Sequence, residues 1–172
     1  MLNTIFFAIP ALLAATATAV DFYQDDTDLP SAPYHPPRSV TPTQQKAIFD
    51  RFADGFLLSG TPLPFLKDHL ADDYIQHNPD FLSDKAAVLQ GFSGDLSSFG
   101  LVYPANVITR GFDEDFGQGW IHYYFTPAAG QQLSVVVDIF RMNGSAIQEH
   151  WDVIQQRPEN ATSPLAMFTP PN

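Results

Sequence analysis

The sequence predicts an α+β domain in which helices come first and antiparallel strands follow. The apolar residues Ile48, Phe52 and Phe56 recur at intervals of four, which is close to the period of a helix. In the second half of the chain apolar and polar residues alternate instead, which is the period of a strand. The dipeptide Asn143-Gly144 joins the last two alternating runs and is the strongest short-range signal for a β-hairpin. Helices followed by a strand meander are typical of helices packed on one face of a sheet.

Local capping signals set the boundaries of the expected helices. Thr41 stands before Pro42, which suits the first helical position, and Gln44 occupies the place of a capping-box partner. We expect this helix to run until Gly60, because glycine commonly follows the end of a helix. Two shorter helices are expected over residues 63–71 and, after a cap at Ser83, over residues 84–91.

The hairpin turn fixes the expected register of the last strands. If Asn143-Gly144 is a two-residue turn, Val137 faces His150 across the ladder. Val135 then faces Asp152 in the same way. The four strands expected in this half of the chain cover residues 106–112, 120–126, 133–142 and 146–156.

His150 and Asp152 are the first candidates for a functional site. Residues two apart in a strand point to the same face, and in this register Asp138 and Glu149 lie opposite each other on the other face. A histidine and a carboxylate among aliphatic neighbours suit proton transfer, because burial moves both pKa values toward neutrality. The alternative is a structural His–Asp pair at a wet edge of the sheet.

A second set of polar residues lies in the run from Tyr74 to Pro79. In an extended segment Tyr74, Gln76 and Asn78 share one face, and His77 lies on the other. A Gln–His–Asn run offers donors and acceptors suited to polarising a carbonyl group or positioning a water molecule. The alternative is a polar cap that ends the segment at Asn78-Pro79.

His122 and Tyr124 are the third contribution to the expected site, because they share a face of the strand that should neighbour residues 133–142. The alternative is that His122, as a lone histidine in a strand, is a structural or exposed side chain. No metal site is predicted, since His150, Asp152 and His77 form only a loose facial triad. The sequence also lacks a phosphate-binding loop, a serine nucleophile elbow and a dinucleotide fingerprint. We therefore expect no cofactor.

The first forty residues are expected to lie outside the folded domain. Residues 1–19 combine a short apolar run with a small-residue pattern ending in A-x-A at Ala19, which is typical of a secretory signal peptide. Residues 20–40 are rich in proline and aspartate and are predicted to be a flexible extension. The domain is then expected to cover residues 41–172.

Two sequons agree with a secreted protein, the absence of cysteine is unusual for one, and the net charge limits its partners. The sequons Asn143-Gly144-Ser145 and Asn160-Ala161-Thr162 predict glycosylation at Asn143 and Asn160. The chain has no cysteine, which excludes disulfides and thiolate chemistry. Its 172 residues include 8 basic and 19 acidic side chains, and the net charge of −11 argues against nucleic acid or an anionic membrane surface as a partner.

Two stretches of the sequence resemble a known family. The run Tyr74-Ile75-Gln76-His77-Asn78-Pro79 and the later run from Asp138 to Gln155 are similar to the early and late motifs of the SnoaL-like branch of the NTF2-like superfamily. The resemblance spans roughly residues 43–168. It implies a cone-shaped α+β fold in which N-terminal helices pack on a curved antiparallel sheet and enclose a pocket.

The resemblance also implies a function. It indicates a cyclase or isomerase that moves protons on a small, hydrophobic, carbonyl-bearing metabolite, and the leader and the missing cofactor motifs make the expected protein secreted and cofactor-independent. Domains of this superfamily often form homodimers through the outer face of the sheet. Asp152, oriented by His150, would remove a proton next to the carbonyl. His77, Gln76 or Asn78 would donate a hydrogen bond to the enolate oxygen. The alternatives are a non-catalytic secreted protein that binds a small hydrophobic ligand and a module that only binds other proteins through the outer face of the sheet.

Overall fold

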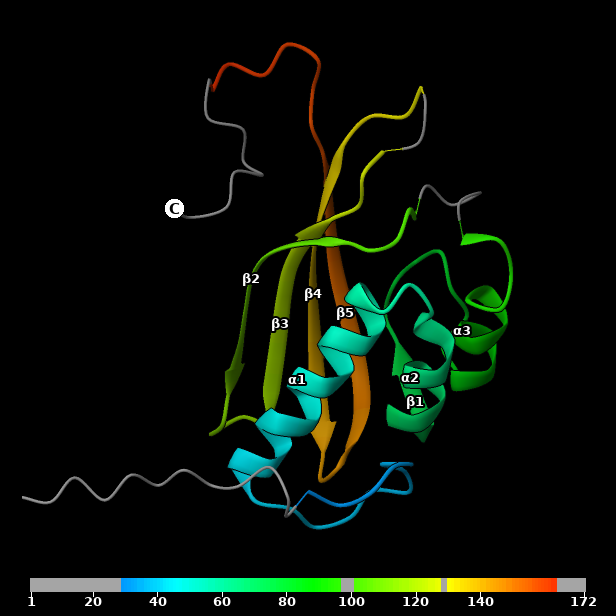
Figure 1. Ribbon diagram of the computed structural model, residues 1–172, viewed down its shortest axis with the longest axis vertical. Helices are drawn as coiled ribbons and strands as arrows, with labels where there is room; N and C mark the ends of the chain where they lie inside the picture. The colour runs from blue at the N-terminus through cyan, green and yellow to red at the C-terminus, as the bar shows by residue number, and fades with distance from the viewer. Residues whose placement is uncertain (1–28, 97–100, 128–129, 164–172) are drawn as a thin grey trace, which may run out of the picture.

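A five-stranded sheet with helices on one face makes up the part of the chain that the computed structural model describes, residues 29–96, 101–127 and 130–163 (Figure 1). The strand order is β1-β5-β4-β3-β2, and neighbouring strands are antiparallel except β1 and β5, which are parallel. The elements are α1 (Pro42–Leu58), α2 (Pro62–His69), β1 (Leu70–Gln76), α3 (Lys85–Gly91), β2 (Asn106–Asp113), β3 (Gln118–Tyr124), β4 (Ser134–Asn143) and β5 (Ala146–Gln156).

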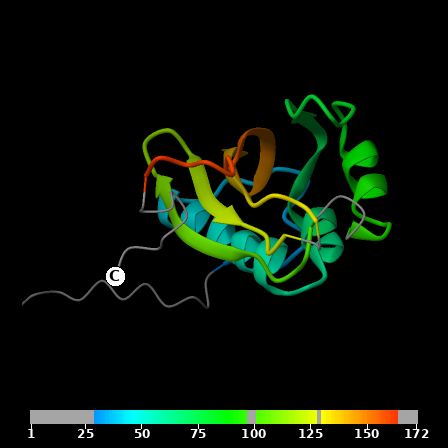
Figure 2. The ribbon, with the colours of Figure 1, turned by 90° about the horizontal axis from the view of Figure 1, so that it is seen from above.

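The sheet is curved, and α1 and α2 lie against its concave face. Figure 2 shows the strands arching over these two helices, with α3 set to one side. Helix α3 packs beside β1, at the edge of the sheet opposite to β2. The prediction of an α+β domain with N-terminal helices on a curved sheet is confirmed. Among the described residues, no helix has the length and apolar character needed to cross a bilayer.

Helix α1 begins where the sequence predicts and builds the centre of the core. The hydroxyl of Thr41 accepts a hydrogen bond from the backbone N–H of Gln44 at 3.2 Å, and the Gln44 side chain accepts one from the N–H of Thr41 at 2.9 Å. The predicted apolar stripe is buried, and the ring of Phe52 meets Phe140 of β4 edge-on at 5.1 Å. Each phenylalanine buried in this way contributes roughly 1.5–3 kcal/mol to the free energy of unfolding.

The two shorter helices differ from the prediction at their ends. Helix α2 stops at His69, because the chain continues without a loop into β1. The cap of α3 is Asp84, whose carboxylate accepts a hydrogen bond from the N–H of Ala87 at 2.6 Å. The hydroxyl of Ser83, the predicted cap, accepts a hydrogen bond from the N–H of Gln76 instead, at 3.1 Å.

Strand β1 is extended as predicted, and its partner is the last strand of the sheet. Gln76 is in register with His150 of β5, and the N–H of His77 donates to the carbonyl oxygen of His150 at 3.0 Å. A parallel partner that lies far along the chain leaves no local signal in the sequence. This pairing brings the two predicted sets of polar residues side by side.

The predicted turn of the β4–β5 hairpin is wrong by one residue. Asn143 pairs with Ala146, so that the turn residues are Gly144 and Ser145. Gly144 has a φ of +54°, in the left-handed region that glycine adopts without strain. Between the pairs made by Met142 and Arg141 the ladder contains a bulge, which shifts the register further.

The corrected register changes the face on which one carboxylate lies. His150 faces Phe140 and Asp152 faces Asp138, so neither lies opposite a valine as we predicted. Asp138 is therefore on the same face as His150 and Asp152, and the prediction that it lies outside is wrong. The predicted neighbours Val135 and Val137 are on the other face of β4.

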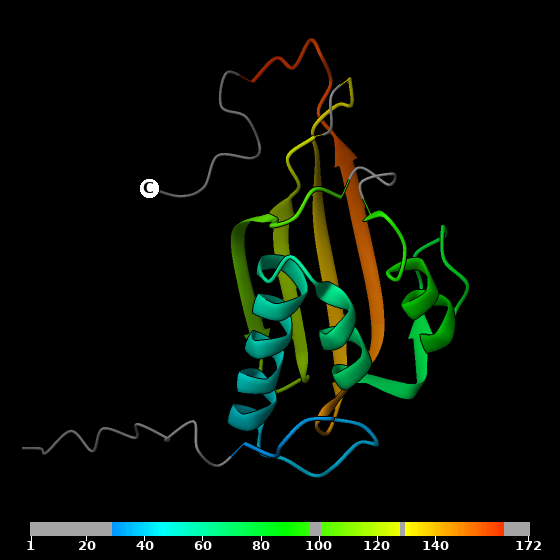
Figure 3. The same ribbon diagram turned by 45° about the vertical axis from the view of Figure 1, so that its right-hand side comes forward.

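Residues 29–40, here called the N-terminal segment, are packed on the domain, and the prediction that they are a flexible extension is wrong for them. Tyr34 is fully buried, and its N–H donates to the carbonyl oxygen of Asp68 at 2.7 Å. The hydroxyl of Ser145 donates to the carbonyl oxygen of Tyr34 at 2.6 Å and accepts from the N–H of Arg38 at 3.0 Å. Figure 3 shows this segment, in blue, crossing the end of the molecule at which the hairpin turns. The predicted signal peptide, residues 1–19, lies outside the described residues.

Candidate functional site

A cavity of about 750 Å³ lies between the concave face of the sheet and α3. This volume is within the range of small-molecule sites. Most of its lining is apolar and comes from every layer of the fold, including Phe56 of α1, Leu66 of α2 and Val88 of α3. The polar residues from the strands are Tyr74, Gln76, Tyr123, Asp138, His150 and Asp152, and Asn78 follows β1.

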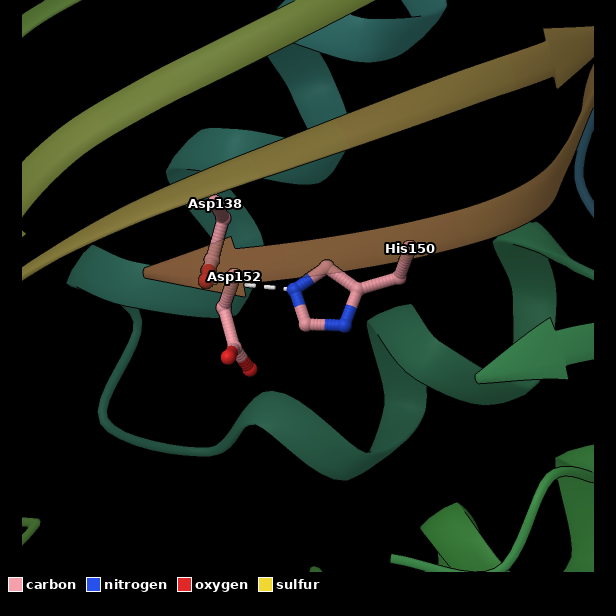
Figure 4. Close-up of side chains that lie close together, drawn as sticks. All are labelled: Asp138, His150 and Asp152. Carbon is pink, nitrogen blue, oxygen red and sulfur yellow. Dashed lines mark ion pairs between the residues drawn. The ribbon is translucent and has the colours of Figure 1, made fainter. Parts of the chain in front are cut away.

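Asp138, His150 and Asp152 form a cluster on the sheet wall of this cavity (Figure 4). Asp138 comes from β4, and the other two come from β5, where they are two residues apart and share a face. One potential ligand atom from each of the three lies within 4.8 Å of the others. His150 Nε2 is 3.1 Å from Asp138 Oδ1, and both side chains are buried.

Gln76 fixes the orientation of the imidazole ring. Its Oε1 accepts a hydrogen bond from the backbone N–H of Asn78 at 3.0 Å, so this oxygen also has to be the acceptor toward His150 Nδ1, at 2.7 Å. His150 therefore carries hydrogen on Nδ1. The ring also stacks on Phe140, with the centroids 4.7 Å apart, which holds its plane.

The two carboxylates are each held through one oxygen. The hydroxyl of Tyr123 donates to Oδ2 of Asp138 at 2.9 Å. The side-chain amide of Asn78 donates to Oδ2 of Asp152. The carbonyl oxygen of that amide accepts from the N–H of Asp80 at 2.7 Å, which fixes the direction in which Asn78 donates. Asp152 is the only one of the three cluster residues that is partly exposed.

Tyr74 supplies a hydrogen-bond donor at the cavity wall. Burial raises its pKa well above the ordinary value of 10, and the carboxylates of Asp138 and Asp152 raise it further. Its hydroxyl accepts a hydrogen bond from Gln76 Nε2 at 3.3 Å. The phenol thus stays protonated at any ordinary pH, and its own O–H can be donated to a ligand.

His77, the third predicted catalytic residue, lies outside the cavity. It is on the outer face of the sheet, where its ring stacks on Trp151 with centroids 4.8 Å apart. Its Nε2 is 3.8 Å from the carboxylate of Glu149. A hydrogen bond from Arg141 lowers the pKa of Glu149. We therefore withdraw His77 from the site.

His122 and Tyr124 are also on the outer face, so the prediction that they bind substrate is wrong. In β3 the side chains that face the core and the cavity belong to Ile121 and Tyr123, one position away from each predicted residue. The alternation in this strand was correct, but the choice of face was not. Tyr123 and Asp138 are the two site residues that sequence reasoning missed.

The two predicted glycosylation sites are exposed. Asn143 is at the end of β4, and Asn160 lies in a turn after β5. Both positions are accessible to solvent. The hydroxyl of Ser145, in the first sequon, is buried by the N-terminal segment.

Comparison with solved structures finds chains with a similar fold. TsrD from Streptomyces laurentii is similar over 63% of this chain and 88% of its own, with a TM-score of 0.50 and 16% identity. A loop-truncation variant of IdmH is similar over 66% of this chain and 92% of its own, with a TM-score of 0.43 and 15% identity. No protein-family model matches the chain, and no curated protein matches it at a significant level. The fold, an α+β cone of the NTF2-like type, is what the likeness to TsrD establishes.

Proposed function

We propose that this protein is a SnoaL-like cyclase or isomerase that transfers protons, without a cofactor, on a small carbonyl-bearing metabolite. The observation that carries the proposal is the cluster of Asp138, His150 and Asp152 on one wall of a cavity that is otherwise mostly apolar. An apolar cavity with a few convergent polar groups is the usual form of a small-molecule site. Fold alone does not give an activity, so the proposal rests on the cluster.

Asp152 is the base in this proposal. It is partly exposed to the cavity, and the amide of Asn78 holds one of its oxygens in place. It takes a proton from the carbon next to the carbonyl, the electron pair of that C–H bond forms a C=C bond, and the π pair of the carbonyl moves to its oxygen. Tyr74 donates its O–H to the enolate oxygen, which is the charge that develops in the transition state. In a ring closure the enolate carbon then attacks a second carbonyl, whose oxygen receives the proton from Asp152.

His150 and Asp138 are held firmly on the same wall as the base. Gln76 and Phe140 fix the ring of His150, and Tyr123 fixes Asp138. Asp138 is in register with Asp152 on the neighbouring strand, and His150 is two residues from Asp152 on the same face. The earlier expectation that His150 orients Asp152 is replaced here, because Asn78 is the residue that donates to it.

Exchange of carbon-bound hydrogen for deuterium tests the proposal without knowledge of the full reaction. The substrates are a panel of small apolar ketones and β-dicarbonyl compounds in D₂O, followed by proton NMR. Asp152→Asn keeps the shape of the side chain and removes the base, so we expect its exchange rate to fall at least about a hundredfold. Glu149→Gln, on the outer face, should leave the rate unchanged. Equal exchange by the wild type and Asp152→Asn would contradict the proposal.

The second candidate is a binding protein, which the apolar lining of the cavity favours. Val136, Phe140 and Ile154 give the sheet wall a large apolar area beside the polar cluster. A cavity of this kind can retain a hydrophobic ligand without reacting with it. If the wild type accelerates exchange of no compound in the panel, and both it and Asp152→Asn retain the same bound ligand in native mass spectrometry, the binding function is correct.

The setting of this function is part of the proposal. The A-x-A pattern at Ala19 favours a secreted protein whose mature chain begins at Val20. The exposed positions of Asn143 and Asn160 are compatible with glycosylation on that route. The partner is a small hydrophobic metabolite, since the negative net charge disfavours nucleic acid and anionic membranes.

A further inference from the structure

We infer that Asp138, His150 and Asp152 form a binding site for one divalent cation of the zinc class. The inference rests on the geometry of these three residues and goes beyond the proposed reaction. Each offers a ligand atom of a type that zinc accepts, an imidazole nitrogen and two carboxylate oxygens. The sequence did not point to this set, because it combined His150 and Asp152 with His77 and placed Asp138 on the wrong face.

The imidazole nitrogen Nε2 of His150 lies against a carboxylate of the cluster. Nδ1 carries a hydrogen, since it donates to Gln76 Oε1, so Nε2 is the nitrogen whose lone pair the neutral ring offers to a metal ion. Nε2 is buried and has no hydrogen-bond partner, although Asp138 Oδ1 is 3.1 Å away. A neutral imidazole nitrogen and a carboxylate oxygen at this distance repel each other unless a positive charge, a proton or a metal ion, lies between them. A neutral imidazole nitrogen is also the commonest metal ligand in proteins.

Each of the three cluster residues is held by a hydrogen-bond partner through its other polar atom. Gln76 holds His150, Tyr123 holds one oxygen of Asp138, and Asn78 holds one oxygen of Asp152. Metal sites have this second layer of hydrogen bonds, which orients the ligands and selects the imidazole tautomer. A cluster of exposed acidic residues does not have it.

The spacing and the charge of the three residues also fit one divalent ion. Ligands of a tetrahedral zinc ion at bond lengths near 2.1 Å lie about 3.4 Å apart. The separation of 3.1 Å between His150 Nε2 and Asp138 Oδ1 is close to this, and the full set lies within 4.8 Å. The remaining distance falls to Asp152, which is partly exposed and whose second oxygen is not the one that Asn78 holds. Two carboxylates neutralise the charge of one divalent ion.

The number and type of the ligands favour Zn²⁺ or Co²⁺ as the bound ion. Three protein ligands leave a fourth position that faces the cavity, as in zinc sites that bind water or substrate. The imidazole favours Zn²⁺ and Co²⁺ over Mg²⁺ and Ca²⁺, which prefer oxygen ligands alone. One consequence depends on the proposed function: a carboxylate that coordinates a cation cannot act as a base, so occupancy of the site should stop proton transfer.

Titration calorimetry with Zn²⁺, and absorption spectroscopy with Co²⁺, test the site on protein first treated with EDTA and then freed of it. We expect one ion per chain on the wild type, with the visible absorption of low-coordinate Co²⁺. Asp138→Asn and Asp152→Asn each remove a charged ligand and should weaken binding by more than about tenfold, which is the smallest loss typical of changes in the outer hydrogen-bond layer alone. His77→Gln is the matched control, because it breaks the other contact between a histidine and a carboxylate in this region, on the outer face. It should bind as the wild type does.

Three outcomes would overturn the inference. They are no saturable binding, binding that survives Asp152→Asn at full strength, and binding that is lost in His77→Gln. Since Asp138 is buried, circular dichroism first confirms that its variant folds, and Asp152→Asn carries the test if it does not. The deuterium-exchange assay on the EDTA-treated protein tests the proposed function independently of metal binding: if that function is wrong, the metal-free protein does not accelerate exchange, whatever the result with Zn²⁺. Inhibition of that exchange by Zn²⁺ would support both statements.

Discussion

Replacing Gly144 by alanine tests whether the N-terminal segment is part of the fold. At Gly144 a Cβ atom would lie 2.3 Å from the carbonyl oxygen of Arg38, and the backbone has a φ of +54°. Gly60 is the matched control, because its φ is +75° but no atom lies within 4 Å of its Cβ position. Both substitutions bear the strain of a left-handed alanine, roughly 1–2 kcal/mol, and only Gly144→Ala meets another part of the backbone.

The expected difference follows from the bonds that the clash would break. To make room, the Arg38 carbonyl has to move away, which breaks its hydrogen bond from the N–H of Ser145 at 2.9 Å and disturbs the bond from the N–H of Arg38 to the Ser145 hydroxyl. Each such bond contributes roughly 1 kcal/mol. Gly144→Ala should therefore lower the free energy of unfolding by roughly 3–4 kcal/mol in all, and Gly60→Ala by roughly 1–2 kcal/mol.

Thermal and urea denaturation followed by circular dichroism measure this difference. For a chain of this length we expect the Tm of Gly144→Ala to fall by roughly 10 °C and that of Gly60→Ala by roughly 4 °C. Limited trypsin digestion gives a local readout, since cleavage after Arg38 should become faster only in Gly144→Ala. Equal losses in the two variants, with unchanged cleavage at Arg38, would refute the packing of the segment against the hairpin.

Two further predictions concern pH and association. Burial lowers the pKa of His69 from 6.5 to about 4, so the unfolded chain binds an additional proton between these pH values and stability should fall by roughly 3 kcal/mol as pH drops from 6.5 to 4. His69→Gln should flatten the dependence of urea midpoint on pH in this window, and an unchanged profile would show that another group is responsible. If the outer sheet face forms a homodimer, Val153→Asp, at a residue 64% exposed there, should lower the sedimentation coefficient. Phe116→Asp, in the β2–β3 turn and 75% exposed, should not, and the reverse result would place the interface elsewhere.

The sequence was sufficient for features that depend on neighbouring residues. The capping box at Thr41 and the stripe of Ile48, Phe52 and Phe56 need no information from the rest of the chain, and both are confirmed. The shared face of Tyr74, Gln76 and Asn78 follows from strand geometry, and all three line the cavity. The prediction that His150 and Asp152 of β5 share the cavity face is correct for the same reason.

The sequence was insufficient where one bulged residue determines which face of the sheet a side chain lies on. Moving the turn by one residue and adding one bulge changes the partner of His150 from Val137 to Phe140. This shift of the pairing is odd, so it exchanges the two faces of β4. The shift brings Asp138 to the cavity, where it completes the cluster. Nothing in the local pattern reports the bulge, because both faces of β4 carry apolar residues. The burial of Tyr34 depends on contacts with residues far along the chain, which composition does not contain.

The cavity has two walls of unlike construction. The polar groups come from β1, β3, β4 and β5, which are neighbouring strands joined by backbone hydrogen bonds, and from Asn78 just after β1. The opposite wall comes from α3, a helix of seven residues, and from the chain that follows it as far as Leu96. Substitutions at Val88 or Phe92 would change the volume and shape that a ligand meets without moving any of the polar groups. Selectivity and reactivity can therefore change independently in this scaffold, one through the helix and the other through the strands.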